Sequence, residues 1–121
     1  MTVSATYRAF VLDQLGRVAK DLRSRGMFGG VGIYAGEFFF ALIDDDTLYL
    51  KVDDTNRPDF LAAGMGPFQP FGEGGEVMQY YEVPADLLEG GEDLGDWIGK
   101  AIDVARRAKR PKRSARKRRT E

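Results

Sequence analysis

A run of six apolar residues, Phe38 to Ile43, constrains the fold of this 121-residue chain more than any other feature. Apolar and polar residues do not alternate in it, which is typical of a strand that lies centrally in a sheet or is covered on both faces. Gly36 precedes the run and the aspartates 44–46 follow it, and glycine and aspartate both favour turns. The run therefore predicts a short central strand with other strands beside it.

The predicted neighbours of this strand come directly before and after it in the chain. Residues 28–34 are expected to form the first, and residues 47–52 the second. In the second, Leu48, Leu50 and Val52 alternate with other residues, so they share one face of the strand. Such alternation indicates a strand with one buried face.

Three prolines limit where the later strands can form and where the last one ends. Pro67 and Pro70 confine residues 67–71 to an edge strand or an extended segment, because proline has no N–H to donate to a strand ladder. Residues 76–83 are a better candidate, and Pro84 ends that strand.

The spacing of apolar residues predicts the helices. They recur every three or four positions from Ser4 to Arg25, which indicates one amphipathic helix ended by Gly26. A short helix is expected between Asp53 and Gly64, one helical turn at 86–88, and a last helix from about residue 92 to 108. These elements predict an α+β fold of two layers: an antiparallel sheet of about five strands with helices packed on it, in the order α-β-β-β-α-β-β-α.

Charge divides the chain into two parts. Residues 1–105 contain 8 Lys/Arg and 18 Asp/Glu, a net charge of −10, whereas residues 106–121 contain 10 Lys/Arg and 1 Glu, a net charge of +9. Like charges repel, and Pro111 disfavours a continuing helix. We therefore predict a domain over residues 1–108 and a disordered basic tail over residues 109–121.

The basic end is the candidate binding segment. One interpretation is contact with the phosphates of nucleic acid or with another polyanion, and the other is a solvated tail that partly neutralises its own acidic body. Both stay open at this point. The candidate residues are Arg106, Arg107, Lys109, Arg110, Lys112, Arg113, Arg116, Lys117, Arg118 and Arg119.

The chain contains neither cysteine nor histidine. Disulfides, thiolate metal sites and catalysis by histidine are therefore excluded, and the lack of cysteine is compatible with a reducing cytoplasm, where we expect the protein. No apolar run approaches the length of a membrane span, and no signal peptide is predicted. Carboxylates and lysines form no recognisable catalytic constellation, so we predict a protein that is not an enzyme.

Two acidic stretches, 44–46 and 53–54, resemble a cation site only in composition. Calcium loops need alternating oxygen ligands, a central glycine and a closing glutamate, and that pattern is absent. Solvated turns are favoured, and no metal or cofactor is predicted.

Lys51 lies opposite the leucine face of its strand. A buried lysine there would be a functional candidate, but an exposed lysine that discourages edge pairing is favoured.

Aromatic residues late in the chain allow a second binding hypothesis. A row of them on a positive surface would stack with the bases of a single strand. The acidic body argues against a nucleic-acid groove, so packing in the core and at its rim is favoured. The residues concerned are Phe68, Phe71, Tyr80, Tyr81 and Trp97.

Three glycines, Gly29, Gly30 and Gly32, lie within the stretch Met27 to Tyr34. A phosphate-binding loop is one interpretation, but such loops follow a strand and open a helix, with Lys and Ser/Thr at their end. This stretch follows a predicted helix and enters a strand, so a bulge, a bend or a close backbone approach is favoured. We predict that Gly29 or Gly30 has a conformation or a contact that a Cβ atom disfavours.

Several motifs occur in a fixed order: Met-Phe-Gly-Gly-x-Gly, Leu-Tyr-Leu-Lys-x-Asp, Asn-Arg followed by Phe, Gly-Met-x-Pro-Phe, paired tyrosines before Val-Pro, and Trp in the last helix. With its motifs in this order, the chain from about residue 5 to 108 resembles the N-terminal domain of the TfoX/Sxy family of competence regulators. The family motif names no catalytic or ligand residues. The residues that carry the resemblance are Met27, Phe28, Gly29, Gly30, Gly32, Leu48, Tyr49, Lys51, Asp53, Asn56, Arg57, Phe60, Gly64, Pro67, Phe68, Tyr80, Tyr81, Pro84 and Trp97.

The resemblance implies a two-layer α+β domain, in agreement with the predicted elements. In full-length family members a second, C-terminal domain follows and the protein promotes transcription of DNA-uptake genes, whereas here a basic tail stands in that position. The resemblance favours a regulatory or protein-binding module, monomeric or homodimeric, with an unidentified protein partner and no membrane. A nucleic-acid-associated protein tethered through its basic tail is the alternative, and an enzyme of unrecognised type is the third.

Overall fold

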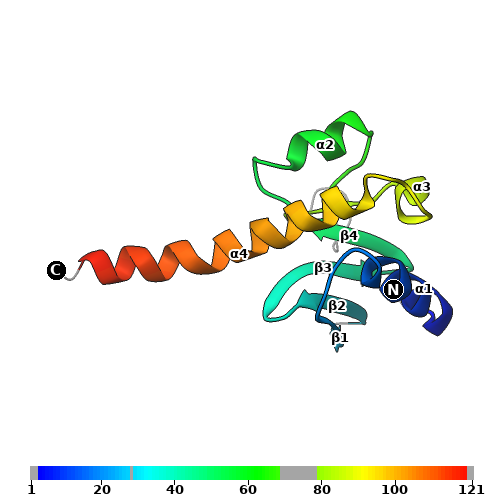
Figure 1. Cartoon of the computed structure of the whole chain (residues 1–121), viewed down its shortest axis with the longest axis horizontal. Helices are drawn as coiled ribbons and strands as arrows, with labels where there is room; N and C mark the ends of the chain where they lie inside the picture. Colours follow the sequence, from blue (N-terminus) through cyan, green and yellow to red (C-terminus); the bar gives the residue numbers. More distant parts are fainter. Residues whose placement is uncertain (1–2, 28, 69–78, 120–121) are drawn as a thin grey trace.

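The computed structural model describes residues 3–27, 29–68 and 79–119, with the backbone alone for Met27 and for residues 109–119. Its elements confirm the predicted class, an α+β domain with an antiparallel sheet (Figure 1). The elements are α1 (Ala5–Gly16), β1 (Leu22–Met27), β2 (Gly30–Ala35), β3 (Phe38–Asp44), β4 (Thr47–Lys51), α2 (Arg57–Ala62), β5 (Tyr80–Glu82), α3 (Ala85–Leu88) and α4 (Leu94–Arg119).

Within the described residues, five strands form one sheet in the order β1-β2-β3-β4-β5, and each neighbouring pair is antiparallel. β3 lies at the centre, as its apolar run predicted. Residues 66–68 run along the outer edge of β5, where the carbonyl of Gly66 accepts the N–H of Glu82 at 3.0 Å. This is the start of the predicted extended segment 67–71. Its remainder, and residues 76–78 of the predicted last strand, lie outside the described residues.

The missing alternation in β3 has a local cause, a β-bulge. Tyr34 pairs with Phe39, and Ile33 pairs with Ala41, so Phe40 is the extra residue on β3. Phe40 and Ala41 are both fully buried in the same core, although adjacent residues of a regular strand point to opposite faces. The unbroken apolar run therefore reflects the bulge as well as the central position of the strand.

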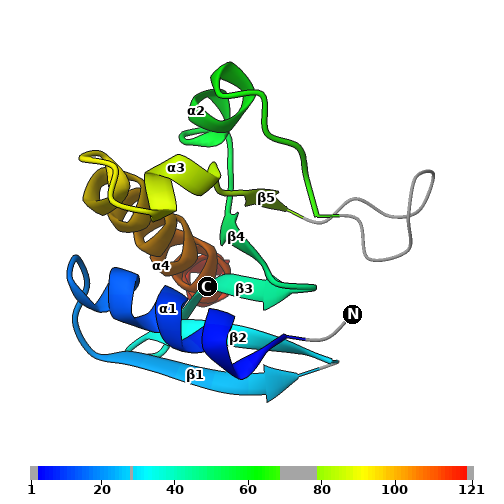
Figure 2. The same cartoon turned by 90° about the vertical axis from the view of Figure 1, so that its right-hand side faces the viewer.

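α1 and α4 cover one face of the sheet (Figure 2). Val11 and Leu15 of α1 and Ile98 of α4 are fully buried, in one core with Ile33 of β2 and Leu50 of β4. Burying an aliphatic side chain of this size contributes about 1.5–3 kcal/mol. This layer of helix against sheet therefore holds the domain together.

The first helix is shorter than the sequence predicted. We expected one helix from Ser4 to Arg25, but α1 ends at Gly16 and residues 22–27 form β1. Ser4 is the predicted N-cap, and its hydroxyl accepts the N–H of Tyr7 at 3.1 Å. The apolar residues after Gly16 fit a helical period only by chance. Residues 22–27 pair with β2 over their whole length, and this pairing favours a strand over a helix.

The glycine-rich stretch forms the turn between β1 and β2. Met27 pairs with Gly30, so two residues connect the strands, of which Phe28 lies outside the described residues. Gly29 has a φ of 81°, a left-handed conformation that suits glycine. A Cβ atom on Gly30 would lie 2.5 Å from the carbonyl oxygen of Ile43. The predicted need for glycine is therefore confirmed at both positions.

The last helix is longer than the sequence predicted. We expected it to end before Pro111, but α4 continues to Arg119 and projects beyond the sheet (Figure 1). A helix that packing has already formed needs no new nucleus to extend, and Lys, Arg and Ala are strong helix formers. The domain boundary at residue 108 and the mobility of residues 109–121 stay predictions. No helix in the described part of the chain is long and apolar enough to cross a membrane.

Candidate functional site

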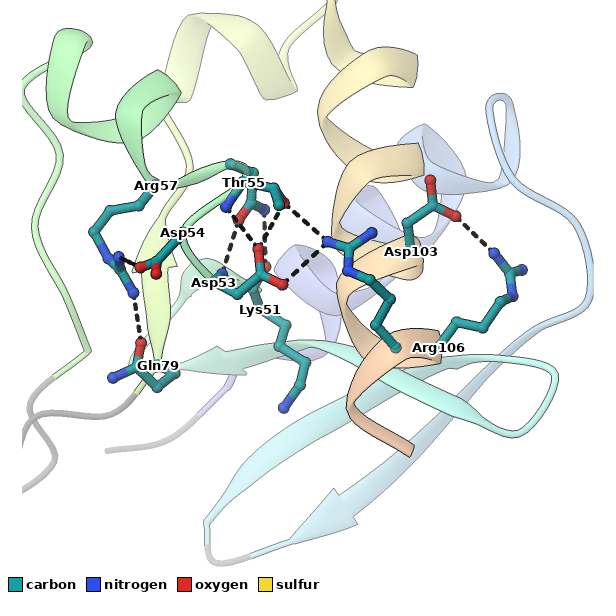
Figure 3. Close-up of polar contacts among 10 residues, drawn as sticks. Lys51, Asp53, Asp54, Thr55, Arg57, Gln79, Asp103 and Arg106 are labelled. Atoms are coloured by element: carbon teal, nitrogen blue, oxygen red, sulfur yellow. Dashed lines mark hydrogen bonds and ion pairs between the residues drawn. The ribbon is translucent and has the colours of Figure 1, made fainter. Parts of the chain in front are cut away.

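A polar corner connects β4 to α2, in the motif that runs from Lys51 to Arg57 (Figure 3). Its centre is Asn56, which is 1% exposed and is the one buried polar residue among those described. Its Oδ1 accepts the N–H of Asp53 at 2.9 Å, and its Nδ2 donates to the carbonyl of Lys51 at 3.1 Å. Asn56 occupies the N-cap position of α2, yet its side chain makes no cap bond. It therefore fixes the turn rather than the end of the helix.

Asp53 joins this corner to α4. Its Oδ1 accepts the N–H of Thr55 at 2.9 Å and the Thr55 hydroxyl at 2.6 Å, and its Oδ2 accepts the guanidinium of Arg107 at 3.0 Å. Burial alone would raise the pKa of Asp53, but the hydrogen bonds from Thr55 and Arg107 outweigh it and hold that pKa below its ordinary value. The ionised carboxylate is thus a structural anchor.

A second ion pair joins α4 to α2. The Nζ of Lys100 lies 2.9 Å from the carboxylate of Asp59. On the outer side of the corner, Arg57 binds Asp54 and donates to Gln79 at 3.0 Å (Figure 3). The Lys100–Asp59 pair holds α2 against α4, and Arg57 joins the corner to Gln79 just before β5, which gives the Asn-Arg motif a structural role.

The structure divides the predicted basic residues into two groups. Arg106 pairs with Asp103 of the same helix at 2.6 Å and lies over the ring of Phe38 of β3, and Arg107 binds the Asp53 anchor, so both contact the body of the domain. The other eight lie in residues 109–119, on the part of α4 that projects beyond the sheet. Their contact with phosphates stays a prediction.

The aromatic residues considered as a stacking platform do not share one surface. Tyr81 and Trp97 both pack on Phe60 of α2, with ring centres 5.8 and 4.6 Å away. Phe68 packs on a tyrosine of β4, with ring centres 4.8 Å apart. Phe71 lies outside the described residues. Packing therefore accounts for these three rings, as we expected.

Tyr80 lies on the face of the sheet opposite to Tyr81. Its ring centre is 5.7 Å from that of Phe39, and its burial, with a smaller effect of Tyr34, raises the pKa of Tyr80 to about 12. The Nζ of Lys51 lies 5.0 Å from the ring centre of Tyr80. Lys51 thus occupies the predicted face, but β4 is not an edge strand, so the expected role in discouraging edge pairing is wrong.

The predicted turn in the acidic stretch 44–46 lies between β3 and β4 and consists of Asp45 and Asp46, because Asp44 ends β3 and pairs with Thr47. Asp45 and Asp46 have φ values of 51° and 52°, a conformation that aspartate tolerates in turns. The carboxylate of Asp46 also accepts the N–H of Ser4 at 2.7 Å. No group of three or more metal-ligating side chains occurs within the described ranges.

Sequence reasoning missed a groove between α3 and the start of α4. Its volume is about 310 Å³. Acidic residues around a lone tryptophan were the available signal, but they come together only when α3 folds back against α4. We call it the Trp97 groove, and its lining includes Pro84, Asp86, Leu87, Glu92, Asp93 and Trp97.

The model of one protein family, the TfoX N-terminal domain, matches residues 13–105, which is well over half of the chain. The chain belongs to the TfoX N-terminal domain family. The match confirms the resemblance seen in the motifs and runs from the end of α1 to the packed part of α4. Comparison with the curated proteins finds no match.

Proposed function

We propose that this TfoX N-terminal domain is a non-enzymatic regulatory module that associates with nucleic acid through the basic end of α4, in a role linked to transcription. The observation that carries the proposal is the composition of residues 109–119, with eight Lys/Arg and no acidic residue on a helix that leads away from the acidic body. Positive side chains arranged along a helix neutralise phosphates without reading sequence.

A non-catalytic role is supported by the contacts of the titratable groups. Asp53 is held by Thr55 and Arg107, and Tyr80 is buried against Phe39. Both have shifted pKa values, which mark candidate catalytic groups in other proteins. Here packing and hydrogen bonds within the fold account for the shifts.

The proposal is tested by fluorescence anisotropy with labelled duplex and single-stranded DNA at several salt concentrations. The full chain should bind both without sequence preference, and a chain ending at Ala108 should not. With about six phosphates contacted, affinity should fall about a thousandfold between ~50 and ~200 mM salt. Equal binding by the two chains, or binding by neither at low salt, would contradict the proposal.

A matched variant separates charge from helix length. The substitutions Arg116→Gln, Lys117→Gln and Arg118→Gln keep the whole chain and remove three positive charges. The slope of log affinity against log salt should become shallower by up to about 2.7, because each phosphate contact contributes about 0.9. An unchanged slope would show that these residues do not touch phosphate.

A second candidate function, protein binding, is favoured by the Trp97 groove. An apolar floor with a charged rim is typical of a docking surface. A photo-crosslinking amino acid in place of Glu92 should capture a specific protein in cells, and the same amino acid in place of Glu82, on β5, should not. Identical capture from both positions would count against this function.

A further inference from the structure

The carboxylates of the Trp97 groove pair with no cation in the part of the chain that the structure describes. Among the described residues, Asp86, Glu92 and Asp93 take part in no ion pair and accept no hydrogen bond through their side chains. The described acidic residues elsewhere on α4, and those that face it, lie in ion pairs, so the carboxylates of the groove differ from their neighbours along this helix. The paired residues are Asp53, Asp59, Asp96 and Asp103, of which Asp59 and Asp96 share Lys100.

The apolar part of the groove suits a long cationic side chain. The ring of Trp97 packs on Phe60 at 4.6 Å and also lines the groove beside Leu87. Arginine and lysine cover apolar surface with their methylene stems and place their charge on an indole face or beside a carboxylate. The groove therefore matches a segment rich in Arg and Lys.

This chain contains such a segment, and it cannot reach its own groove. Residues 109–119 carry eight Lys/Arg and no acidic residue. They belong to the same continuous helix as Trp97, and at ~1.5 Å per residue Lys109 lies ~18 Å and Arg119 ~33 Å further along its axis. Figure 1 shows α3, beside the groove, and the end of α4 at opposite ends of the molecule.

We infer that the Trp97 groove of one copy binds the basic end of α4 of a second copy, so that chains associate head to tail. The inference rests on the protein-binding function of the groove and names its occupant. Each copy uses its groove once and its helix once, and such unlike surfaces build rings or open filaments rather than a two-fold dimer. Because the contact joins opposite charges at the surface, salt should weaken it.

The test measures the mass of the intact, nuclease-treated chain by sedimentation. At ~50 mM salt the average mass should rise with concentration above that of one chain, and at ~500 mM, where charges are screened within a few ångströms, it should not. Trp97 is the only tryptophan, so its emission should change over the same range of concentration. A single chain at every concentration and salt would overturn the inference.

A charge exchange tests the pairing itself. The groove variant is Glu92→Lys with Asp93→Lys, and the helix variant is Arg116→Glu with Lys117→Glu, Arg118→Glu and Arg119→Glu. Each should associate at least about tenfold more weakly, because like charges then face each other. Their equimolar mixture should associate again, because the unchanged groove of the helix variant matches the unchanged basic helix of the groove variant. The control Asp13→Lys with Glu82→Lys makes the same change in charge as the groove variant and should associate normally.

Three results would reject the head-to-tail contact. In the first, the groove variant still associates as the natural chain does. In the second, the control loses as much association as the groove variant. In the third, the mixture of the groove and helix variants does not associate. The helix variant changes only residues beyond the sheet, so its loss of association does not come from misfolding. If the chain does not self-associate but position 92 captures another protein, the inference fails and the protein-binding function stands.

Discussion

Gly30 is the first residue of β2 and lies directly against the backbone of β3. A Cβ atom there would lie 2.5 Å from the carbonyl oxygen of Ile43, which belongs to the central strand and cannot easily move. We expect Gly30→Ala to destabilise the domain by about 1–3 kcal/mol, the usual cost of overpacking, in urea unfolding. Gly26→Ala is the control, because nothing lies within 4 Å of its Cβ position. Equal losses for the two variants would remove the special role of Gly30.

Asn56 is the buried polar residue on which the corner depends. Replacing it with alanine leaves the N–H of Asp53 and the carbonyl of Lys51 without their partner. Asn56→Ala should therefore lower the free energy of unfolding by about 2–4 kcal/mol, as each unsatisfied group costs about 1–3. Asp13→Ala, which removes an exposed ion pair, should change it by no more than about 0.5 kcal/mol. A loss as small as that of the control would mean that water replaces Asn56 in these bonds.

At the scale of elements, patterns in the sequence predicted the helices and strands that depend mainly on interactions between residues close together in the chain. The strands β3 and β4, the short helix α2 and the turn α3 all follow from apolar runs, alternation, Pro58 and the acidic turns. β1 was missed because only its pairing with β2 distinguishes it from a helix. The extension of α4 past Pro111 was missed because a packed helix overrides a residue that usually ends one.

At the candidate site, the contact between Asp53 and Arg107 is another feature that sequence patterns could not predict. These residues are 54 positions apart, and no spacing in the sequence relates them. The motif around Asn56 was recognised, but its hydrogen bonds depend on the exact turn after β4. The basic end could be read from composition alone, whereas the Trp97 groove required the packing of α3 on α4.

The anchor between Asp53 and α4 should make stability depend on pH. Folding lowers the pKa of Asp53 below its ordinary 3.8, so the stabilisation is complete above that value and is lost as the pH falls through the lower folded-state pKa. Asp53→Asn should thus be less stable than the natural chain at pH 7, and the difference should shrink below about pH 3.8. Because 38% of the Asp53 side chain is exposed, solvent screening limits the difference to about 0.5–1 kcal/mol.

A double-mutant cycle with Arg107→Gln checks this assignment. If the ion pair is responsible, the double variant should lose less stability at pH 7 than the sum of the two single losses. Chemical unfolding at pH 7 and pH 3 gives both comparisons. Strict additivity at pH 7 would assign the effect of Asp53 to Thr55 alone.

For the whole molecule, charge separation is the governing feature. A body of net charge −10 and an end of net charge +9 make the molecule strongly polar along α4, and both proposals use the positive end. If both proposals hold, nucleic acid and the groove of a second copy compete for residues 109–119. Binding to one reduces the fraction of chains that is free to bind the other.

This competition predicts an increase in DNA affinity when the groove is disabled. At low salt, and at protein concentrations where nine tenths of the chains are associated, the variant Glu92→Lys with Asp93→Lys should bind duplex DNA about tenfold more tightly than the control Asp13→Lys with Glu82→Lys, because all its basic ends are free. Both variants change the charge of the body equally, so the difference isolates the occupied helix. Anisotropy titrations should converge once the protein is diluted below its association range. Equal affinities at every concentration would show that the groove does not hold the basic end.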